Sequence, residues 1–429
     1  MKASAGNRIL MLLENNPYPG DVRVRREART LVAAGCQVTV ISPKPRGRPW
    51  HEVVDGVRTY RYPMPRAGDG LVGYLWEYGF SLSMTCVLTF YVFVRRGFDV
   101  IHAHNPPDLF VLIAMFYKLF GKRFVFDHHD LSPEMYRARF ESGGNRLMFN
   151  ILVWFEKLTF ALADHVIATN ESYKRVEMER GKVPEERITI VRNGPDLNRL
   201  NPVDPDPELR EKAECIIGFV GVMGHQDGLD YLLRSLRHLI HDIGRSDFHC
   251  VIIGDGAERK RLLRLASELK LDERVWFTGH ISDEDMIRYL CTTDICVDPD
   301  PSNEFNDRST MVKMTEYMAL GRPIVAYNLP EHRVTAQEAA VYARANDELD
   351  FARQIDALMK DPDRRRQMGQ FGRKRVEAEL AWAVQEQHLL KAYDKLGVAI
   401  SVRPAPKVAS PSAVPRETLI ASNIGPRSS

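Results

Sequence analysis

The sequence predicts an α/β protein with two Rossmann-like domains, and three observations support this fold class. Short apolar runs ending in polar loops alternate with amphipathic segments, as expected for parallel sheets covered by helices. This alternation stops over residues 196–214, where Pro, Asp, Asn and Glu are frequent, and then starts again. The chain has 429 residues, a length for which two domains are the default.

Charge and cysteine usage exclude several classes of protein. The net charge of +2 is too small to indicate binding to nucleic acid. The six cysteines form no Cys-x-x-Cys pair and mostly lie in apolar segments, which indicates reduced thiols rather than a disulfide framework. The N-terminal segment lacks the pattern of a secretory signal. We therefore expect a cytoplasmic protein.

One apolar stretch, Gly79 to Val94, is followed by Arg95 and Arg96. It is shorter than the roughly 20 residues that cross a bilayer. It is expected to form a buried helix of the first domain, or a helix that also lies on the inner face of the plasma membrane. Residues 74–96 would then mediate peripheral membrane association.

The first βαβ unit begins with a buried strand at Arg8–Leu13 and a turn-rich loop that ends at Gly20. Asp21 is the expected N-cap of the next helix, whose inner face carries Val24, Ala28 and Leu31. Ligands of α/β proteins bind at the carboxyl ends of strands, which places this loop at the site. The basic residues of the helix either form a solvated face or bind an acceptor phosphate, and these are Arg23, Arg25 and Arg26.

Two further strands of the first half end in histidine-containing loops, at His104 and at His129-Asp130. The histidines His104 and His128 either face the site or are satisfied within their loops. We expect no metal here, because no helix carries a His-x-x-x-His pair nearby. The helix from Asn145 to Leu162 carries Trp154, which is expected in the core.

The second half opens with a buried strand at Cys215–Gly221 and a glycine-rich loop to Gly228. A loop of this kind before a helix can hold a phosphate through backbone N–H groups. Two later strands, near Val251 and Val275, end at Gly254 and Gly279.

The central stretch is a polar loop after Asp298, a helix from Met311 to Leu320 closed by Gly321, and a strand to Tyr327. Ser309 or Thr310 is expected to cap the helix. Lys313 and Glu316 share one face near its start, where a cation suits phosphates and a carboxylate suits ribose hydroxyls. Asp298-Pro-Asp300 has the spacing of a metal-binding pair, but the prolines fit a turn better.

The run Glu316-Tyr-Met-Ala-Leu-Gly-Arg-Pro-Ile-Val-Ala resembles the second half of the donor signature of family 4 retaining glycosyltransferases. That signature has a first Glu eight residues earlier, where this chain has Arg308. The variant resembles a bacterial subgroup that transfers N-acetylated sugars of the fucosamine type in O-antigen or capsule synthesis. The Arg and Lys that usually neutralise the pyrophosphate are replaced near the glycine-rich loop, where His225 is the only ionisable base.

The resemblance implies the GT-B fold, with two Rossmann-like domains facing each other across a cleft. The expected organisation is an acceptor-side domain at 1–195, a linker at 196–214, a donor domain at 215–376, a helix at 377–397 that crosses back to the first domain, and a disordered tail at 398–429.

The resemblance and the loop positions together give the candidate site residues. Residues expected to act in transfer are His129, Asp130, Lys313 and Arg308. Donor-binding candidates are Gly221, Gly224, His225, Gly254, Gly279, His280, Ser309, Thr310, Glu316, Glu331 and Arg333. Acceptor-side candidates are Asn16, Gly20, Arg23 and His104.

The function implied is transfer of a sugar from a nucleotide-sugar donor, expected to be UDP-linked, to a lipid-linked or glycan acceptor with retention of configuration. No cofactor or metal is expected. Two alternatives remain open at this point: a nucleotide-sugar epimerase on the same fold, and a catalytically silent donor-binding scaffold. The substitution at Arg308 and the missing Arg/Lys pair keep the second of these open.

Overall fold

The structure is a computed structural model that describes residues 6–64, 71–138 and 144–400. The first domain is built on an eight-stranded sheet of order β3-β4-β2-β1-β5-β6-β7-β8, parallel except for the β3–β4 pair. Its strands are β1 (Arg8–Leu12), β2 (Gln37–Pro43), β3 (His51–Val54), β4 (Val57–Tyr62), β5 (Val100–His104), β6 (Arg123–His128), β7 (His165–Ala168) and β8 (Ile188–Ile190).

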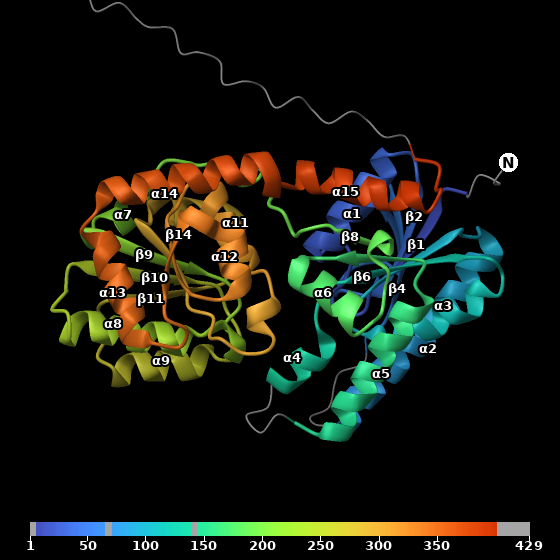
Figure 1. The fold of residues 1–429 in the computed structure, drawn as a ribbon, viewed down its shortest axis with the longest axis horizontal. Coiled ribbons are helices and arrows are strands. Elements are labelled where there is room, and N and C mark those ends of the chain that lie inside the picture. The colour runs from blue at the N-terminus through green and yellow to red at the C-terminus, as the bar shows by residue number, and fades with distance from the viewer. Residues whose placement is uncertain (1–5, 65–70, 139–143, 401–429) are drawn as a thin grey trace, which may run out of the picture.

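Helices cover both faces of this sheet, because alternate residues of each strand point to opposite sides. In β1, Leu10 and Leu12 join the core beneath α2, α3 and α5, whereas Ile9 and Met11 join the core beneath α1 and α15. Figure 1 shows these two layers. The helices are α1 (Val22–Ala33), α2 (Leu71–Arg95), α3 (Val111–Lys118), α4 (Ser132–Ala138), α5 (Arg146–Leu162) and α6 (Glu171–Glu179).

The second domain is built on a six-stranded sheet of order β11-β10-β9-β12-β13-β14, and all its named strand pairs are parallel. Its strands are β9 (Cys215–Val220), β10 (Phe248–Ile253), β11 (Val275–Gly279), β12 (Ile295–Asp298), β13 (Ile324–Tyr327) and β14 (Ala340–Ala343). Its helices are α7 (Pro207–Arg210), α8 (Leu229–His241), α9 (Arg259–Glu268), α10 (Asp283–Thr292), α11 (Val312–Ala319), α12 (Pro330–Ala336), α13 (Glu348–Met359) and α14 (Pro362–Arg375).

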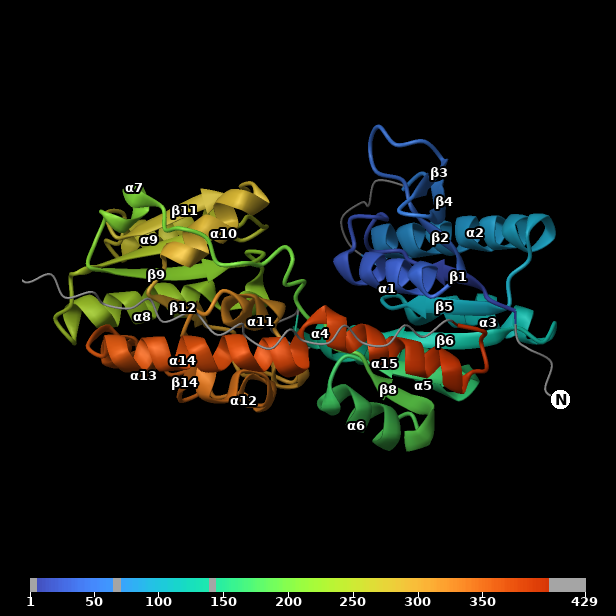
Figure 2. The ribbon, with the colours of Figure 1, turned by 90° about the horizontal axis from the view of Figure 1, so that it is seen from above.

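The last described helix, α15 (Trp382–Lys395), returns to the first domain (Figures 1 and 2). A π-helical turn over Val376–Leu380 connects it to α14, and the Trp382 N–H donates to the Pro195 carbonyl. Farther along, the Tyr393 hydroxyl and His102 Nδ1 are 2.8 Å apart. The two domains are therefore joined by two chain crossings.

Local predictions hold at the start of α1 but not at the start of α11. The Asp21 side chain accepts from the Val24 N–H, as expected for an N-cap. The N-cap of α11 is Met311, and neither Ser309 nor Thr310 caps this helix, because their hydroxyls are used elsewhere. Val398 is buried, so the part of the predicted tail up to residue 400 packs on the first domain. Residues 401–429 of that tail lie outside the described residues.

Two helices expected in the core are exposed instead. Trp154 of α5 is 57% exposed, and only 22% of the apolar window Trp76–Arg95 in α2 is buried. The interpretation of Gly79 to Val94 as a buried helix is therefore wrong. The reason is that α2 and α5 lie on the outside of the sheet with no further layer above them (Figure 1).

Candidate functional site

The carboxyl edge of the first sheet is organised by one buried arginine. Arg23 of α1 donates to both carboxylate oxygens of Asp127, at 2.7 and 3.0 Å, and lies 3.1 Å from Glu27. It also donates to the Val191 carbonyl at 2.8 Å and to Asn193 Oδ1 at 2.9 Å. Arg23 thus ties α1, β6 and the segment after β8 together.

This position of Arg23 corrects the sequence-based interpretation. The prediction of a solvated basic face fails for Arg23, which is buried, although Arg25 of the same helix is exposed. The guanidinium is directed inward onto carboxylates that come from elsewhere in the chain, and all its interactions described above are internal. Its chemistry fits a positioning role under the site better than contact with an acceptor.

Three histidines surround Asp127. His104 Nδ1 and His129 Nε2 lie 3.1 and 2.8 Å from Asp127 Oδ2, and these two histidine nitrogens are 3.2 Å apart. Burial lowers the pKa of His102 and of His104. Burial alone would raise the pKa of Asp127, but Arg23 and His129 hold it well below its usual range. His104 is therefore a buried histidine paired with Asp127 through Nδ1, not an open acceptor-side residue.

Four ligand atoms in this cluster lie close enough to hold a metal ion. They belong to Glu27, His102, His104 and Asp127 and lie within 4.8 Å of one another. A metal ion here would be repelled by the charge of Arg23, whose guanidinium nitrogens lie 3.1 Å from Glu27 and 2.7 Å from Asp127. The expectation of no metal stays a prediction.

The His129-Asp130 loop is held by an amide that the sequence analysis did not single out. Asn105 Oδ1 accepts from the N–H groups of His129 and Asp130, at 2.6 and 3.2 Å. Asn105 Nδ2 donates to the Asp130 carbonyl at 2.7 Å. A polar residue directly after the β5 strand was the available signal. His129 has a partly exposed side chain and is the member of the histidine cluster that reaches the surface.

The neighbouring His128 is not part of this surface. It is buried with Nδ1 3.1 Å from Glu177 and Nε2 3.7 Å from Glu156. Burial opposes its charge, but these two carboxylates raise the pKa of His128 to about 10. His128 is thus a charged structural histidine, the second of the two alternatives in the sequence analysis.

At the carboxyl edge of the second sheet, three strands end in glycine turns that meet. The Gly221 N–H donates to the Ile253 carbonyl, and the Gly254 N–H donates to the Gly279 carbonyl. Gly254 has φ +130°, and a Cβ atom there would lie 2.0 Å from the Gly221 carbonyl oxygen. No side chain fits at this position, so the backbone is left bare beside the Gly221–Gly228 loop.

Lys313 lies below this loop. It is buried, with Nζ 2.5 Å from Asp300, 3.3 Å from Asp298 and 3.9 Å from Asp227. Burial opposes its charge, but Asp298 and Asp300 raise the pKa of Lys313. The Asp298-Pro-Asp300 pair therefore faces an ammonium group, and the ammonium is held by carboxylates rather than directed freely at a ligand.

Glu316 of α11 is partly exposed at the junction of the two domains. Its Oε1 lies 3.5 Å from Arg199 Nη1. Burial raises the pKa of Glu316, while the positive charges of Arg199 and of Arg26 in α1 lower it. The carboxylate is thus available at the surface between two arginines that the sequence analysis did not connect with it.

The loop before α11 contacts the first domain directly. Asn170 Nδ2, from the N-cap of α6, donates to the Arg308 carbonyl at 2.9 Å and to Thr310 Oγ1 at 3.0 Å. The Tyr173 hydroxyl is 3.1 Å from Ser309 Oγ. Asp130 lies on the same side of the first domain as Tyr173, and burial together with the Asp130 carboxylate raises the pKa of Tyr173.

Two more predicted donor-side residues take part in contacts between the domains. Glu331 Oε1 accepts from Ser172 Oγ of α6 at 2.5 Å, and Glu331 is buried. Arg308 Nη1 lies 3.4 Å from Glu134 of α4. The polar groups of Ser309, Thr310 and Glu331 are therefore already paired across the interface between the domains. This differs from the prediction that they bind the nucleotide-sugar donor.

The remaining predicted residues lie in loops around the carboxyl edges of the two sheets. His225 opens the short 3-10 helix of the glycine-rich loop, directly after Gly224, and is exposed, as is His280 after β11. Arg333 donates to Asn328 Oδ1 at 2.5 Å, and on the first domain Asn16 and Gly20 are exposed in the loop after β1.

Arg259 is a site candidate that the sequence analysis did not select. It is the first residue of α9, and Nη2 lies 3.8 Å from the position of a Cβ atom on Gly279. Its Nε is buried with no hydrogen-bond partner in the part of the chain that the structure describes. Its place just after the Gly254-Asp-Gly256 turn was the available signal.

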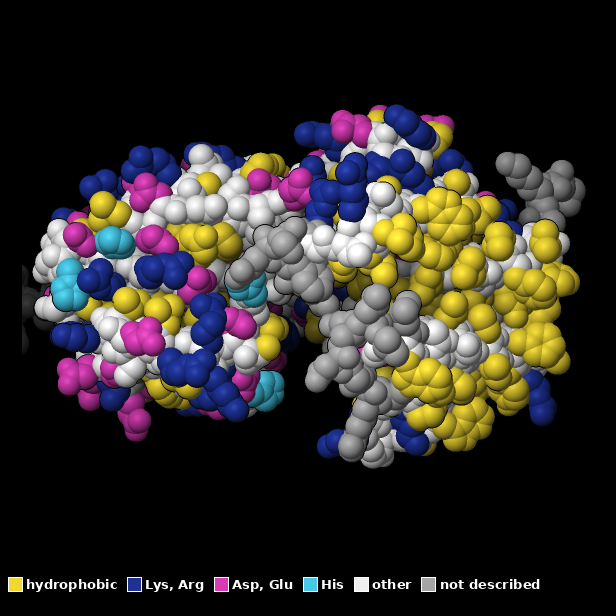
Figure 3. Space-filling view, turned by 90° about the horizontal axis from the view of Figure 1, so that it is seen from below, with side chains coloured by type: hydrophobic (Ala, Val, Ile, Leu, Met, Phe, Trp, Pro, Cys, Tyr) yellow, Lys and Arg dark blue, Asp and Glu magenta, His cyan; other side chains and the backbone are white. Residues whose placement is uncertain are grey.

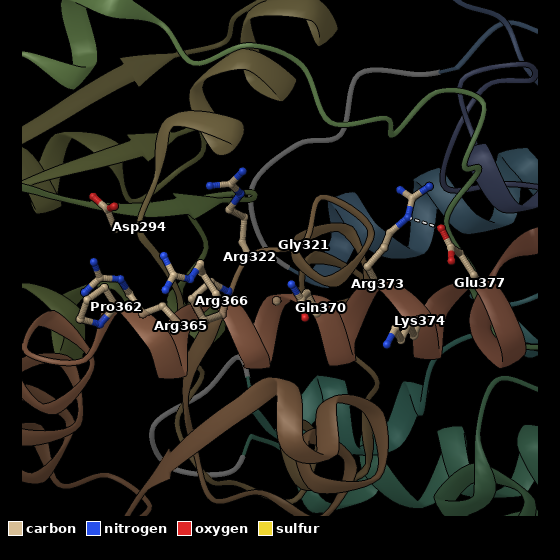
Figure 4. A pocket seen from close by; sticks show the side chains of 12 residues that line it. Asp294, Gly321, Arg322, Pro362, Arg365, Arg366, Gln370, Arg373, Lys374 and Glu377 are labelled. Atoms are coloured by element: carbon tan, nitrogen blue, oxygen red, sulfur yellow. Dashed lines mark hydrogen bonds and ion pairs between the residues drawn. The ribbon is translucent and has the colours of Figure 1, made fainter. Parts of the chain in front are cut away.

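A basic groove of about 640 Å³ lies on the second domain at the opposite edge of the sheet (Figure 4). It is lined by residues that precede β12 and β13, among them Asp294 and Arg322. Its arginines bond to carbonyls: Arg322 Nη1 to Thr293 at 2.9 Å and Arg365 to Leu358 at 2.6 Å. Ligands of α/β sheets bind at the carboxyl ends, so this groove is a structural feature of α14.

Two family models match the chain. The family described as "Glycosyl transferase 4-like domain" matches residues 20–194, and the family described as "Glycosyl transferases group 1" matches residues 214–361. The first match covers the strands of the first sheet except β1, and the second covers all strands of the second sheet.

Curated relatives are similar over different shares of the chain. A D-inositol 3-phosphate glycosyltransferase of Nocardia farcinica is 28% identical over 250 residues, 56% of this chain and 54% of that enzyme. A 2-deoxystreptamine glucosyltransferase of Streptomyces kanamyceticus is 23% identical over 359 residues, 80% of this chain and 84% of that enzyme. The first match thus spans about half of the relative.

Solved structures share the fold over nearly the whole chain. Sucrose-phosphate synthase from Thermosynechococcus elongatus has a TM-score of 0.76 at 21% identity, covering 91% of this chain and 99% of that one. The Anabaena protein HepE in complex with UDP-glucose has a TM-score of 0.68 at 14% identity, covering 90% and 99%. Together with the two parallel sheets, these similarities confirm the predicted GT-B fold.

Proposed function

We propose that the chain is a glycosyltransferase of the family 4 type that transfers a sugar from a UDP-linked donor to a lipid-linked or glycan acceptor with retention of configuration. The donor sugar is N-acetylated, and the product belongs to a bacterial surface polysaccharide. The relatives named above act on inositol phosphate and on 2-deoxystreptamine, so a family-level likeness alone leaves the acceptor open.

Two features of the second domain carry the proposal: the bare glycine turns at the carboxyl ends of three strands, and Glu316 of α11. Three strand ends converge at Gly221, Gly254 and Gly279, where backbone without side chains allows a close approach of a diphosphate to the adjoining loop. Glu316 offers an acceptor for ribose hydroxyls at the start of the adjacent helix. HepE, which has the same fold, binds UDP-glucose.

The first domain supplies the groups that meet the donor sugar. His129 and Asp130 are fixed by Asn105 and lie opposite the loop before α11. Closely fixed polar groups on the far side of a cleft can orient the anomeric carbon towards an acceptor hydroxyl. Closure of the domains around both substrates would exclude water and limit hydrolysis of the donor.

Charge on the leaving diphosphate must be stabilised as the sugar–oxygen bond breaks. Lys313 is the nearest buried cation to the glycine-rich loop, and it rests on Asp298 and Asp300 before the donor arrives. A lysine side chain is flexible, so its ammonium can turn from Asp300 to a phosphate oxygen. Arg259 and Arg308 are additional cations at the rim, where the family's Arg/Lys pair is missing.

The scaffold alternative is favoured by one specific observation, the pairing of Lys313 with three carboxylates. If the ammonium never leaves Asp300, donor binds without turnover, and the protein is a silent donor-binding subunit.

A thermal-shift series with UDP, GDP, dTDP and CMP, followed by transfer assays with labelled UDP-sugars, tests these functions. A nucleotide at 100 times its Kd adds about 2.7 kcal/mol of stability. We expect a shift with UDP that grows with an N-acetylated UDP-sugar, and label in a lipid extract of the source cells. A shift without transfer would favour the scaffold, isomerised UDP-sugar without acceptor would favour the epimerase, and no shift with any nucleotide would contradict the proposal.

A further inference from the structure

The first domain has an exposed apolar face formed by α2, residues 111–120 and α5. Of the 23 exposed large hydrophobic side chains among the described residues, twelve belong to these three segments. Aromatic contacts join the segments, since the ring of Phe93 in α2 lies 5.1 Å from that of Tyr117 and 5.7 Å from that of Phe120. Figure 3 shows the hydrophobic side chains gathered over this one domain. Apolar patches of this extent mark an interaction surface.

The helix α2 has polar side chains on its buried face and apolar side chains on its exposed face. Its residues at a spacing of four, Ser81, Thr85 and Thr89, are hydroxyl side chains with exposures of 0–1% that point into the domain. On the opposite face Val87 and Phe90 are about 60% exposed. An amphipathic helix on the surface of a soluble protein has the reverse pattern, with its polar residues facing the solvent. This inversion is the pattern expected where the outer solvent is hydrocarbon.

Basic side chains without a described ion pair border the apolar face. Arg95 and Arg96 end α2, Arg146 begins α5, and Lys157 follows along α5, and all four are exposed. On the described residues of the three segments no acidic side chain is fully exposed, since Glu77 is partly buried and Glu156 is buried. Such a border complements the negative surface of an anionic bilayer.

From these features we propose that the apolar face of α2, residues 111–120 and α5 lies in the headgroup region of an anionic lipid bilayer. Trp76, Tyr91 and Trp154 are exposed on this face, and rings of this kind prefer the membrane–water interface. Two copies of the chain facing each other would bring their basic borders together, which opposes a dimer through this face.

The helix lies on the membrane and does not cross it. By length and composition alone the window Trp76–Arg95, with mean hydropathy 1.3, could span a bilayer. However, the face of α2 that carries Ser81, Thr85 and Thr89 is buried in the domain, and Val92 is packed in the core. A crossing would require that core to open.

The face also adjoins the loop of the candidate site. The Arg137 guanidinium lies 3.6 Å from the ring centroid of Phe149 in α5, and Arg137 Nη1 lies 3.3 Å from Glu304 of the loop before α11. A membrane beneath α5 would therefore lie next to the segment that joins the two domains. This placement does not depend on the proposed donor or acceptor.

The test is sedimentation of the full chain with vesicles, without substrate. We expect binding to vesicles of phosphatidylcholine with 30% phosphatidylglycerol, and much weaker binding to phosphatidylcholine alone or at high salt. The variants Leu119→Glu and Val87→Glu should each lower the partition coefficient at least tenfold, because an exposed apolar side chain becomes charged. The matched control Leu263→Glu, on α9 of the other domain, should bind as the unchanged protein does.

The basic border is tested separately. Arg95→Gln with Arg96→Gln should weaken binding to anionic vesicles about fivefold per charge. The control pair Arg237→Gln with Arg264→Gln removes two exposed charges from the second domain and should change binding little. Circular dichroism melting checks that each variant is folded.

Three outcomes would overturn the proposal: no binding of the folded protein to either vesicle, equal loss with Leu263→Glu, or a dimer in solution that Leu119→Glu converts to a monomer.

Discussion

Arg23 of the first domain and Lys313 of the second are both buried beneath the edge where the strands end, but they are held in different ways. In the first domain Arg23 makes short bonds to Asp127, Val191 and Asn193, which come from separate elements. In the second domain Lys313 has a single head group among Asp298 and Asp300. The guanidinium is a planar group with fixed directions, whereas an ammonium on a flexible stem can change partners.

The difference indicates that the first edge is fixed in advance and the second can respond to a ligand. The Arg23 network sets the positions of the histidines before substrate arrives. At the second edge the glycine turns leave the backbone bare, and Lys313, a buried cation beneath them, is able to move.

Replacement of Lys313 should have the largest effect. Lys313→Met leaves Asp298 and Asp300 buried without a counter-charge, and we expect the free energy of unfolding at pH 7 to fall by about 3–5 kcal/mol. Denaturant titration measures this loss. Adding Asp298→Asn and Asp300→Asn should restore most of the stability but not turnover. If the triple variant keeps full turnover, the ammonium has no part in transfer. Lys260→Met, at an exposed site on α9, is the control.

His129 tests the contribution of the first domain to turnover. His129→Ala should lower turnover about 100-fold, as for other fixed polar contacts to a reacting centre, and leave the Kd for UDP unchanged. Steady-state kinetics and calorimetry separate the two quantities. An equal change in UDP affinity would place His129 at the nucleotide instead. His241→Ala, at an exposed site on α8, should change neither.

Arg23→Lys tests whether the stability of the first domain depends on the planar guanidinium group of Arg23. Lysine keeps the charge but cannot reproduce the paired bonds to Asp127, so we expect a loss of about 1.5–3 kcal/mol in the free energy of unfolding. The matched change Arg29→Lys, on the exposed side of the same helix, should cost less than about 0.5 kcal/mol. Equal effects at the two sites would remove the contrast between the two cations.

Glu316→Gln tests whether the Glu316 carboxylate contributes to the binding of UDP. Loss of a charged acceptor for ribose hydroxyls should raise the Kd for UDP about tenfold, which corresponds to about 1.4 kcal/mol. Calorimetry with UDP gives the value directly. The exposed acid Glu284 on α10 supplies the control Glu284→Gln. Unchanged affinity for UDP would contradict the ribose assignment.

A pH titration of stability reports on His128. Its pKa of about 10 in the folded protein exceeds that of an unfolded histidine, so its contribution is fully present below pH 6.5 and is lost as the pH rises through 10. The slope due to this group is at most about 1.4 kcal/mol per pH unit. The difference between the unchanged protein and His128→Gln should shrink towards pH 10, and a constant difference would contradict the charge assignment.

The sequence predicts the sheets well, because buried parallel strands appear as continuous apolar runs such as Arg8–Leu12 and Cys215–Val220. The Asp21 cap and the glycine turns are local features and were also predictable. By contrast, Arg23 pairs with Asp127 across a separation of 104 residues, which no local pattern reveals. Helical spacing alone gives Arg23 the appearance of a solvated residue.

The inversion of α2 is visible in the sequence, since Ser81, Thr85 and Thr89 recur at the spacing of one helical face. The apolar content of the same stretch nevertheless predicts a helix in the core. Apolar content alone does not distinguish a face that meets the sheet from a face that meets another solvent. The contacts of Ser309 and Glu331 with α6 also depend on the docking of two domains, for which residue spacing carries no information.

The double crossing between the domains has a consequence for synthesis on the ribosome. The first domain lacks α15, with the Tyr393 partner of His102, until the whole second domain has been translated. The second domain, from Cys215 to Arg375, can complete its sheet earlier. The first domain to emerge is thus the last to finish folding, and a chain cut before Trp382 would damage the histidine cluster of the first domain rather than the second domain beside the cut.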